Sequence, residues 1–232
     1  YDDRAKKISR SFVKILVHSN VNFAVLGTEE SSTGDAAKRA GNEFLFQMQA
    51  MTNIEVLNGY EVKKIVTCDP HSFNTLKNEY SSLGGKYEVF HHTQFIQNLI
   101  SEGRLKIDDT VLKGKRVTFH DPCYLGRAND VYESPRDLIK RLGVNLTEMK
   151  RNKSSALCCG AGGAQMFKDA EKGDKEINVL RTEDALETNP EIIATGCPYC
   201  NTMMTDGIKF KEKEAEVVVK DIAELIAEAN NL

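Results

Sequence analysis

The sequence predicts an α/β fold of two pseudo-repeated, Rossmann-like βαβ halves with mostly parallel sheets. Short β-branched and apolar runs alternate with segments of helical periodicity, as they do in βαβ units. There is also an internal similarity, because residues 63–67 match residues 191–195 at an offset of 128 positions. The same offset aligns residues 69–72 with residues 197–200.

The first half, residues 1–110, is expected to be incomplete at its N-terminus. Its strands are predicted over 23–27, 63–67 and 87–90, and its helices over 36–57, 72–80 and 93–101. We expect Asp35 to be the N-cap of its first helix. The apolar residues at helical spacing in that helix predict a core face: Phe44, Leu45, Met48, Met51 and Ile54.

The second half, residues 111–232, is predicted to hold one strand more than the first. Its strands are expected over 116–120, 145–149, 191–195 and 216–219. Helices are expected from Ser134, with Pro135 at the first helical position, and over 173–187, 197–209 and 221–229. The first half has no counterpart of the strand at 116–120, so we expect that strand to lie before Tyr1.

Charge and hydropathy exclude several classes of partner. The 232 residues contain 31 Lys and Arg against 34 Asp and Glu, a net charge of −3. This balance gives no reason to expect nucleic acid or an anionic membrane surface as a partner. No apolar run approaches the roughly 18 residues of a spanning helix, and the start has no signal-peptide pattern. We expect a cytoplasmic protein that reaches the inner membrane face only through partners.

The cysteines carry the functional signal. Of six cysteines, five follow one pattern: Cys123, 34 residues, Cys158-Cys159-Gly160, 36 residues, and Cys197-Pro198-Tyr199-Cys200. The last motif joins a predicted strand to a predicted helix. The helix N-terminus there lowers the pKa of a thiol, and the thiolate is the form that binds metal or attacks.

Five converging thiols favour an iron–sulfur cluster over zinc. Neighbouring side chains such as Cys158 and Cys159 point to different sides of an extended chain, so they bridge two irons more easily than they chelate one ion. A structural zinc site takes four ligands and would leave one thiol over. Zinc, a metal-free thiol–disulfide centre at Cys197 and Cys200, and buried core cysteines remain alternatives.

Histidine and arginine give weaker signals. His120 ends the strand before Cys123 and could give a proton to a leaving thiol, although a hydrogen-bonded loop residue is the simpler interpretation. His71 is interpreted as a turn residue or a remnant of a duplicated site, and His91-His92 as a polar loop pair. Arg136 is expected to be solvated.

The cysteine pattern resembles that of the cysteine-rich Cys-Cys-Gly domain family. The family includes the B subunit of heterodisulfide reductase and the iron–sulfur subunits of glycolate and lactate oxidising complexes. The second half matches its motif at each of the five cysteines, with both spacings inside the family's range. In the first half, Asp69 and Ser72 stand where two of the cysteines would be, so the resemblance carries no ligand over to that half.

The resemblance implies ligands, cofactor and activity. Cys123, Cys158, Cys159, Cys197 and Cys200 would hold a [4Fe–4S] cluster, noncubane or cubane, or else zinc. The chain would be a heterodisulfide reductase-like subunit that moves electrons between a flavoprotein or ferredoxin-type partner and a disulfide or quinone-linked acceptor. The alternative is a non-catalytic scaffold subunit of a respiratory or hydroxy-acid-oxidising complex, stabilised by its metal.

Overall fold

The computed structural model describes residues 2–169 and 172–232, and its strands form two parallel sheets. In the smaller sheet, β1 (Lys64–Thr67) pairs with β2 (Glu88–His91). The larger sheet has the order β4–β3–β5–β6, with strands Arg116–Phe119 (β3), Asn145–Leu146 (β4), Ile192–Thr195 (β5) and Val218–Asp221 (β6). The predicted α/β class with parallel sheets is therefore confirmed.

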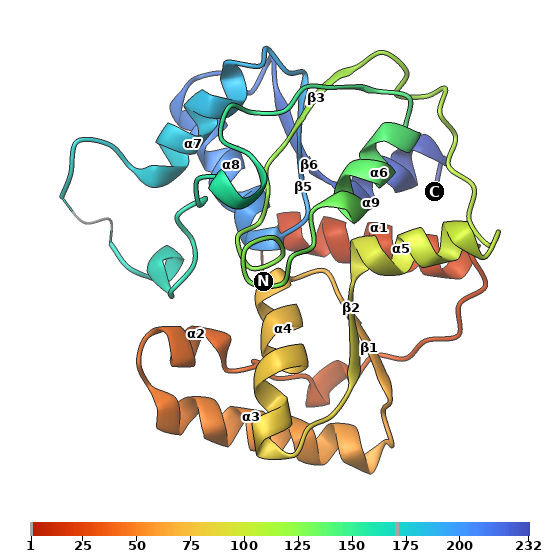
Figure 1. Ribbon diagram of the computed structural model, residues 1–232, viewed down its shortest axis with the longest axis vertical. Coiled ribbons are helices and arrows are strands. Elements are labelled where there is room, and N and C mark those ends of the chain that lie inside the picture. Colours follow the sequence, from red (N-terminus) through yellow and green to blue (C-terminus); the bar gives the residue numbers. More distant parts are fainter. Residues whose placement is uncertain (1, 170–171) are drawn as a thin grey trace.

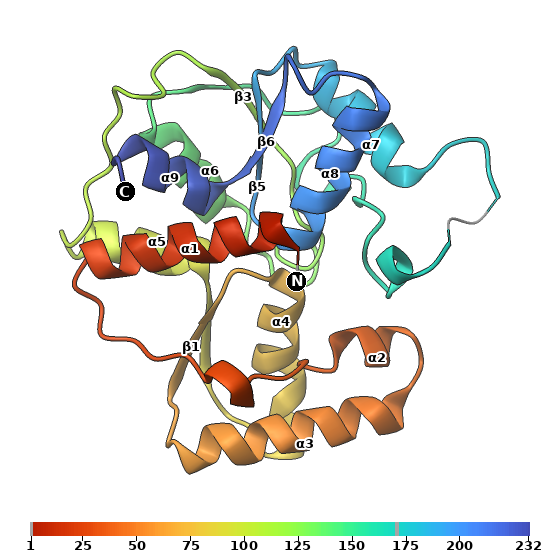
Figure 2. The same ribbon diagram turned by 180° about the vertical axis from the view of Figure 1, so that it is seen from behind.

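Helices cover both faces of the larger sheet (Figure 1). Helices α7 and α8 lie on one face, while α6, α9 and α1 lie on the other, and both views show this arrangement (Figure 2). The helices are α1 (Asp3–His18), α2 (Asp35–Arg39), α3 (Glu43–Gly59), α4 (Pro70–Asn74), α5 (His92–Ser101), α6 (Glu133–Arg141), α7 (Ile177–Leu186), α8 (Pro198–Phe210) and α9 (Ile222–Ala229). Helix α4 continues through a π turn and a 3-10 turn as far as Leu83.

The internal similarity corresponds to a repeated strand–helix unit. Strand β1 and helix α4 repeat as β5 and α8: 128 positions separate Lys64 from Ile192 and Pro70 from Pro198. Each of the two helices has proline at its first position, and the N-caps are Asp69 and Cys197. The sequence offset therefore identifies structurally matching helix N-termini.

Residues 23–27 do not form the predicted strand. The backbone is irregular and enters a 3-10 turn at Gly27, and the side chains of Phe23 and Val25 are 40% and 73% exposed. Apolar runs this short do not show whether a neighbouring strand is available to pair with. The unpredicted helix α1 precedes this segment instead, and its buried face includes Phe12, Ile15 and Leu16.

Helix boundaries also differ from prediction. The single helix expected over 36–57 is two helices, because the chain turns at Gly41, whose φ of +86° favours glycine. Asp35 is the first residue of α2, and Gly34 is the N-cap. In α6, Ser134 and Pro135 lie inside the first turn, which starts at Glu133.

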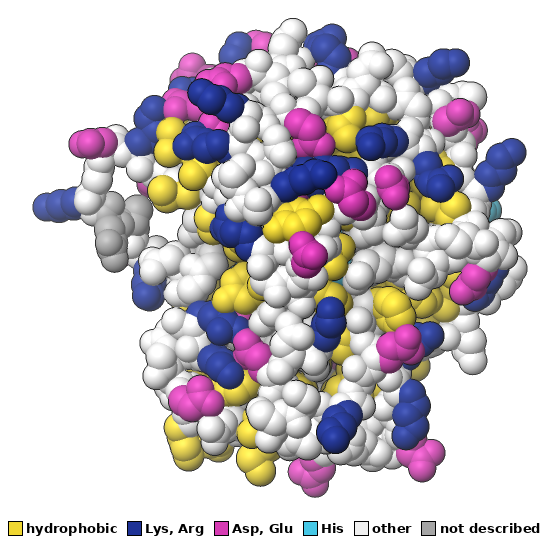
Figure 3. Space-filling model, viewed as in Figure 1, with side chains coloured by type: hydrophobic (Ala, Val, Ile, Leu, Met, Phe, Trp, Pro, Cys, Tyr) yellow, Lys and Arg dark blue, Asp and Glu magenta, His cyan; other side chains and the backbone are white. Residues whose placement is uncertain are grey.

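The predicted core face of α3 is mostly wrong. Ile54 is buried, but Phe44, Met48 and Met51 are 75%, 53% and 60% exposed. Apolar side chains surround this helix almost completely, so periodicity could not select the buried face. Hydrophobic side chains accordingly show at the lower edge of the molecule, where α3 lies (Figure 3). The face that packs inward carries Phe46, Ala50, Asn53, Ile54 and Leu57.

Helix α1 shares its core with elements of the second half. Its buried side chains belong to the same hydrophobic cluster as Phe119 of β3, Leu138 of α6 and Ile226 of α9. A separate cluster, which includes Phe46 and Phe73, fills the space between α3 and α4. The boundary between halves at residue 110 stays a prediction.

His91 and His92 are buried and bond to distant segments, so they are not the expected polar loop pair. Both rings are 0% exposed. The Nε2 atom of His91 lies 3.0 Å from the carbonyl oxygen of Gly196, and that of His92 lies 2.9 Å from Oδ1 of Asp221. The first contact ties the end of β2 to the segment that leads into α8, and the second ties the start of α5 to the N-cap of α9.

The buried His91 should make stability depend on pH. Burial, and then the neighbouring His92, lower the pKa of His91 well below 6.5. The unfolded chain therefore binds a proton that the folded chain does not, and stability falls as pH decreases below about 6.5. Between pH 7.5 and pH 5.5, the free energy of unfolding measured in urea should fall by about 1 kcal/mol more for the wild type than for His91→Asn. His18 is exposed, so His18→Asn is the control and should behave as the wild type. A decrease in His91→Asn as large as that in the wild type would contradict the prediction.

Candidate metal centre

The predicted cysteines come from three segments that end at one place. Cys197 is the N-cap of α8 and Cys200 lies in its first turn, directly after β5. Cys123 follows β3, the strand that pairs with β5. Cys158 and Cys159 lie in the loop after a 3-10 turn at residues 153–155. The carboxyl ends of adjacent parallel strands thus place the first and last of these segments side by side.

The five thiols form one continuous group. A hydrogen bond links Cys200 to Cys159, and the thiols of Cys123, Cys158 and Cys197 lie close enough to shift pKa values within the group. The Sγ atoms of Cys159 and Cys200 are 3.4 Å apart. Cys159, Cys197 and Cys200 are buried, whereas Cys123 and Cys158 are half-buried. Cys123 and Cys158 are therefore the more exposed members of the group.

The electrostatics of this group favour a bound cation. Hydrogen bonds from Cys123 and Cys159 lower the pKa of Cys158, and the N–H of Gly160 adds a bond of 3.3 Å to its sulfur. The hydrogen bond to Cys158, followed by burial, raises the pKa of Cys123, and bonds to Cys159 and Cys197 raise that of Cys200. One thiolate is thus stabilised by its neighbours, and several thiolates would require a metal to balance their charge.

Gly160 has a conformational reason to follow the cysteine pair. Its φ is +91°, which L-residues with a side chain rarely adopt. This turn directs the Gly160 N–H back to the sulfur of Cys158. A backbone N–H donor at sulfur stabilises a thiolate in the same way that it stabilises cluster sulfurs.

His120 points one ring nitrogen into the thiol group. Its Nδ1 accepts a hydrogen bond of 3.0 Å from Nε of Arg181, so a neutral ring carries its proton on Nε2. That buried Nε2 has no partner among the described residues. A ligand atom of His120 lies within 4.8 Å of the sulfurs of Cys159 and Cys200. The unpartnered donor fits a negatively charged, sulfur-containing group in the pocket.

The pKa of His120 bears on its predicted role. Burial, assisted by the charge of Arg181, lowers this pKa to about 3. The ring is therefore neutral near pH 7 and donates a hydrogen bond from Nε2 without acting as an imidazolium. Proton donation by His120 stays a prediction that this environment does not favour.

A buried ion pair fixes the loops that carry Cys123 and Cys158. The guanidinium of Arg136 binds both carboxylate oxygens of Asp121, at 2.7 and 2.9 Å, and both oxygens of Glu148. Asp121 also accepts the N–H of Lys153 at 2.8 Å. Arg136 is 2% exposed, so its expected solvated role is wrong. The only sequence signal for this pair was the nearness of Asp121 to Cys123.

The matching place in the first half contains oxygen and nitrogen atoms instead of thiols. Asp69 accepts hydrogen bonds from the N–H groups of His71 and Ser72 and from the Ser72 hydroxyl. In the same half, the Ser31 hydroxyl donates a hydrogen bond to Oδ1 of Asn53. Cys68 is partly buried against the main core, and burial raises its pKa well above the usual value.

Comparison with known proteins identifies the family. The fold and the site define an α/β protein with cysteines gathered near the carboxyl ends of two adjacent parallel strands. The family model described as "Cysteine-rich domain" matches residues 1–77 and 117–205, so the chain belongs to this family. The match spans both halves, including the first half that lacks the thiol ligands.

Curated relatives are iron–sulfur proteins and redox enzymes. The chain is 48% identical to "Probable iron-sulfur-binding oxidoreductase FadF" of Bacillus subtilis, over 99% of this chain and 32% of that protein. It is 43% identical to "EtfAB:quinone oxidoreductase" of Syntrophomonas wolfei, over 99% and 33%. A subunit of the "Dihydromethanophenazine:CoB--CoM heterodisulfide reductase" of Methanosarcina barkeri is 35% identical, over 94% and 54%. The chain thus spans about a third of the first two relatives.

A membrane span is not found among the described helices. Within residues 2–169 and 172–232, none of the helices combines the length and the apolar composition that crossing a bilayer requires. One relative, 44% identical over 99% of this chain and 34% of its own length, is named "Probable membrane-anchored ferredoxin" of Chromohalobacter salexigens.

The Asp121–Arg136 pair should stabilise the centre measurably. Asp121→Asn leaves the buried guanidinium of Arg136 with part of its charge unbalanced. We therefore expect the free energy of unfolding measured in urea to fall by about 2–3 kcal/mol. Glu133→Gln is the control, because the Lys153–Glu133 pair is 46% and 62% exposed and should contribute less than about 1 kcal/mol. Equal losses in the two variants would show that the buried pair is not the anchor.

Proposed function

We propose that Cys123, Cys158, Cys159, Cys197 and Cys200 hold a [4Fe–4S] cluster and that the chain is an electron-transferring part of a larger oxidoreductase. The observation that supports this most strongly is the closeness of the five thiols, which shift pKa values within the group, with Cys159 and Cys200 in direct contact. Cluster irons take more thiolates than a single tetrahedral ion does. Such a cluster would supply one-electron transfer to the site.

The residues around the thiols would stabilise the negative charge of the bound group. The Gly160 N–H and the Nε2–H of His120 would donate to sulfur, while Arg181 fixes the His120 ring from behind. Met166, Met203 and Tyr199 pack against the buried cysteines and limit water on that side. Hydrogen bonds and solvent exclusion of this kind set the potential of a cluster.

The electron path is proposed from the chemistry of the site and the names of the relatives. Electrons would arrive from a flavoprotein or ferredoxin-type partner and leave to a disulfide or a quinone-linked acceptor. One relative is named for a quinone and another for a heterodisulfide. The half-buried Cys123 and Cys158 mark the side on which an acceptor could approach. We propose a cytoplasmic location, with any contact to the membrane made through partners.

Zinc is the second candidate, and one specific observation favours it. The donor atoms of His120, Cys159 and Cys200 lie within 4.8 Å of one another, and mixed Cys and His ligands suit a tetrahedral zinc site. The chain would then be a metal-stabilised scaffold without a redox step of its own.

Ligand substitution tests the proposal. Cys159→Ser should hold less than half of the wild-type iron after anaerobic purification, and its reduced form should not be oxidised by an added disulfide or quinone. Cys68→Ser is the matched control, because Cys68 lies outside the thiol group and should keep full iron content and oxidation rate. Full iron content in Cys159→Ser would overturn the ligand assignment.

A further inference from the structure

His71 of the first half lies against the segments that carry the cysteines of the second half. It sits in the first turn of α4 and is 6% exposed. Its ring stacks on Tyr124, with centroids 4.2 Å apart, and meets Tyr199 edge-on at 5.4 Å. A β-carbon placed on Gly162 would lie 3.5 Å from its Cε1.

These three contacts place His71 beside all three segments of the thiol pocket. Tyr124 follows Cys123, Tyr199 lies between Cys197 and Cys200, and Gly162 belongs to the loop that begins at the cysteine pair. Helices α4 and α8 accordingly start close together, at the junction of the halves (Figure 1). His71 is thus a first-half side chain directed at the second-half centre.

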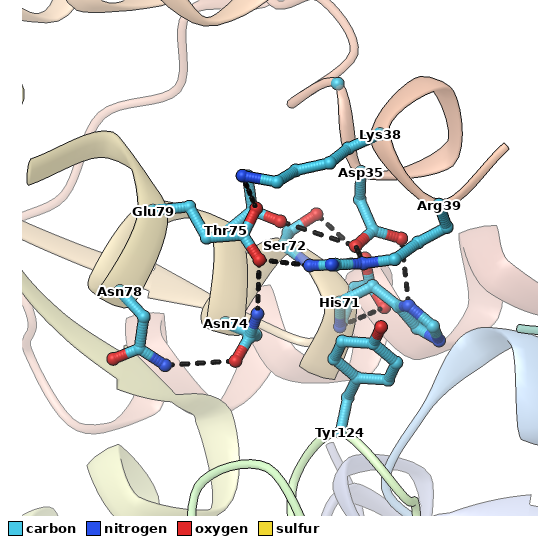
Figure 4. Close-up of polar contacts among 12 residues, drawn as sticks. Asp35, Lys38, Arg39, His71, Ser72, Asn74, Thr75, Asn78, Glu79 and Tyr124 are labelled. Atoms are coloured by element: carbon cyan, nitrogen blue, oxygen red, sulfur yellow. Dashed lines mark hydrogen bonds and ion pairs between the residues drawn. The ribbon is translucent and has the colours of Figure 1, made fainter. Parts of the chain in front are cut away.

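Asp35 holds the ring in this orientation. Its Oδ2 lies 2.9 Å from Nδ1 of His71, and its Oδ1 accepts from Nε of Arg39 at 3.1 Å. Arg39 also pairs with Glu79, so the carboxylate of Asp35 is fixed from its far side (Figure 4). The Nε2 of His71 points away from Asp35 and makes no hydrogen bond to any described residue (Figure 4).

We propose that His71, oriented by Asp35, gives a proton to a two-electron acceptor bound beside the cysteine centre. This inference rests on the function proposed above. A disulfide that takes two electrons from a reduced flavoprotein or ferredoxin-type partner loses its S–S bond and becomes two thiolates. One thiolate takes the Nε2 proton of His71, and the second takes a proton from solvent. A quinone takes up the same two electrons and two protons on its oxygens.

The charges around His71 favour the protonated ring that this step needs. Burial alone would lower the pKa of His71, but the hydrogen bond to Asp35 and the charges of Asp69, Asp35 and Cys158 outweigh burial and raise it. The phenols facing the ring are neutral near pH 7, because burial raises the pKa of Tyr199 to about 12 and also raises that of Tyr124. The guanidinium of Arg39 pairs with Oδ1 of the same Asp35 carboxylate whose Oδ2 bonds to the ring.

His120 and His71 therefore differ in kind. His120 has Nδ1 occupied by a donor from Arg181, and its pKa is about 3. His71 has Nδ1 against a carboxylate, which stabilises the imidazolium. A general acid needs a proton to give and a partner that allows the ring to regain it, and only the environment of His71 supplies both.

The first test compares His71→Gln with His18→Gln in the iron-loaded chain, using a small alkyl disulfide and a short-chain quinone as separate acceptors. His71→Gln should keep the iron content and the EPR signal, while acceptor reduction slows by about 100-fold. In the wild type the rate should decline as pH rises through the pKa of His71, and His71→Gln should lack this decline. His18 is exposed on α1, so His18→Gln should behave as wild type.

A second measurement does not depend on turnover. Histidine ring NMR of the oxidised protein should show His71 titrating above 6.5, with the signal assigned by its absence in His71→Gln. Asp35→Asn should lower this pKa by about one unit or more, because the opposite charge is lost. A pKa of His71 below 6.5, or an unchanged pKa in Asp35→Asn, would contradict the proposal that Asp35 favours the protonated His71 ring.

The outcomes separate the two proposals. If His71→Gln reduces both acceptors as fast as His18→Gln does, the proton-donor role is wrong and the cluster function stands. If the iron-loaded wild type reduces neither acceptor, the proposed function fails, and the role of His71 fails with it. Slowing with the disulfide alone, or with the quinone alone, supports the inference and identifies the acceptor.

Discussion

Five thiols in one largely buried pocket are the constraint on which the rest of this structure depends. Thiolates repel one another at such distances, and burial removes the water that would screen them. Without a cation the group shares its protons, so that one thiolate accepts hydrogen bonds while its neighbours stay protonated. A bound metal group would reverse this balance by favouring the ionised form of every sulfur. The chemistry of the thiol group therefore supports the proposed metal site.

The surrounding fold supplies the rigidity and the compensating dipoles. Parallel pairing of β3 with β5 places Cys123 near the start of α8, where the helix N-terminus favours thiolates. Arg136 ties the loop after β3 to the segment before Cys158, and Arg181 fixes His120 behind the sulfurs. His71 of the first half lies against Tyr124 and Tyr199, which neighbour these cysteines in the chain. The predicted first half, which lacks the thiols, thus places a side chain beside the proposed site of the second half.

Motif spacing singled out cysteine segments that the fold brings together, whereas local pattern misplaced several elements of the fold. The five cysteines were found because thiols at strand–helix junctions have few structural explanations, and the offset of 128 positions correctly aligned α4 with α8. Residues 23–27 were expected as a strand, since apolar content alone does not show whether a pairing partner exists. Helix α3 was given the wrong buried face, because apolar residues surround it. The roles of Arg136 and Asp35 were predicted wrongly, because the partners of a buried charge come from distant segments that only the fold brings together.

The most direct test of the metal site is composition. The full chain would be purified without oxygen, and iron, acid-labile sulfide and zinc would be measured on the same sample used for EPR. We predict about four irons and four sulfides per chain, with an EPR signal that changes on oxidation or on addition of a thiol. One zinc and no iron per chain would contradict the cluster and would make the chain a structural subunit.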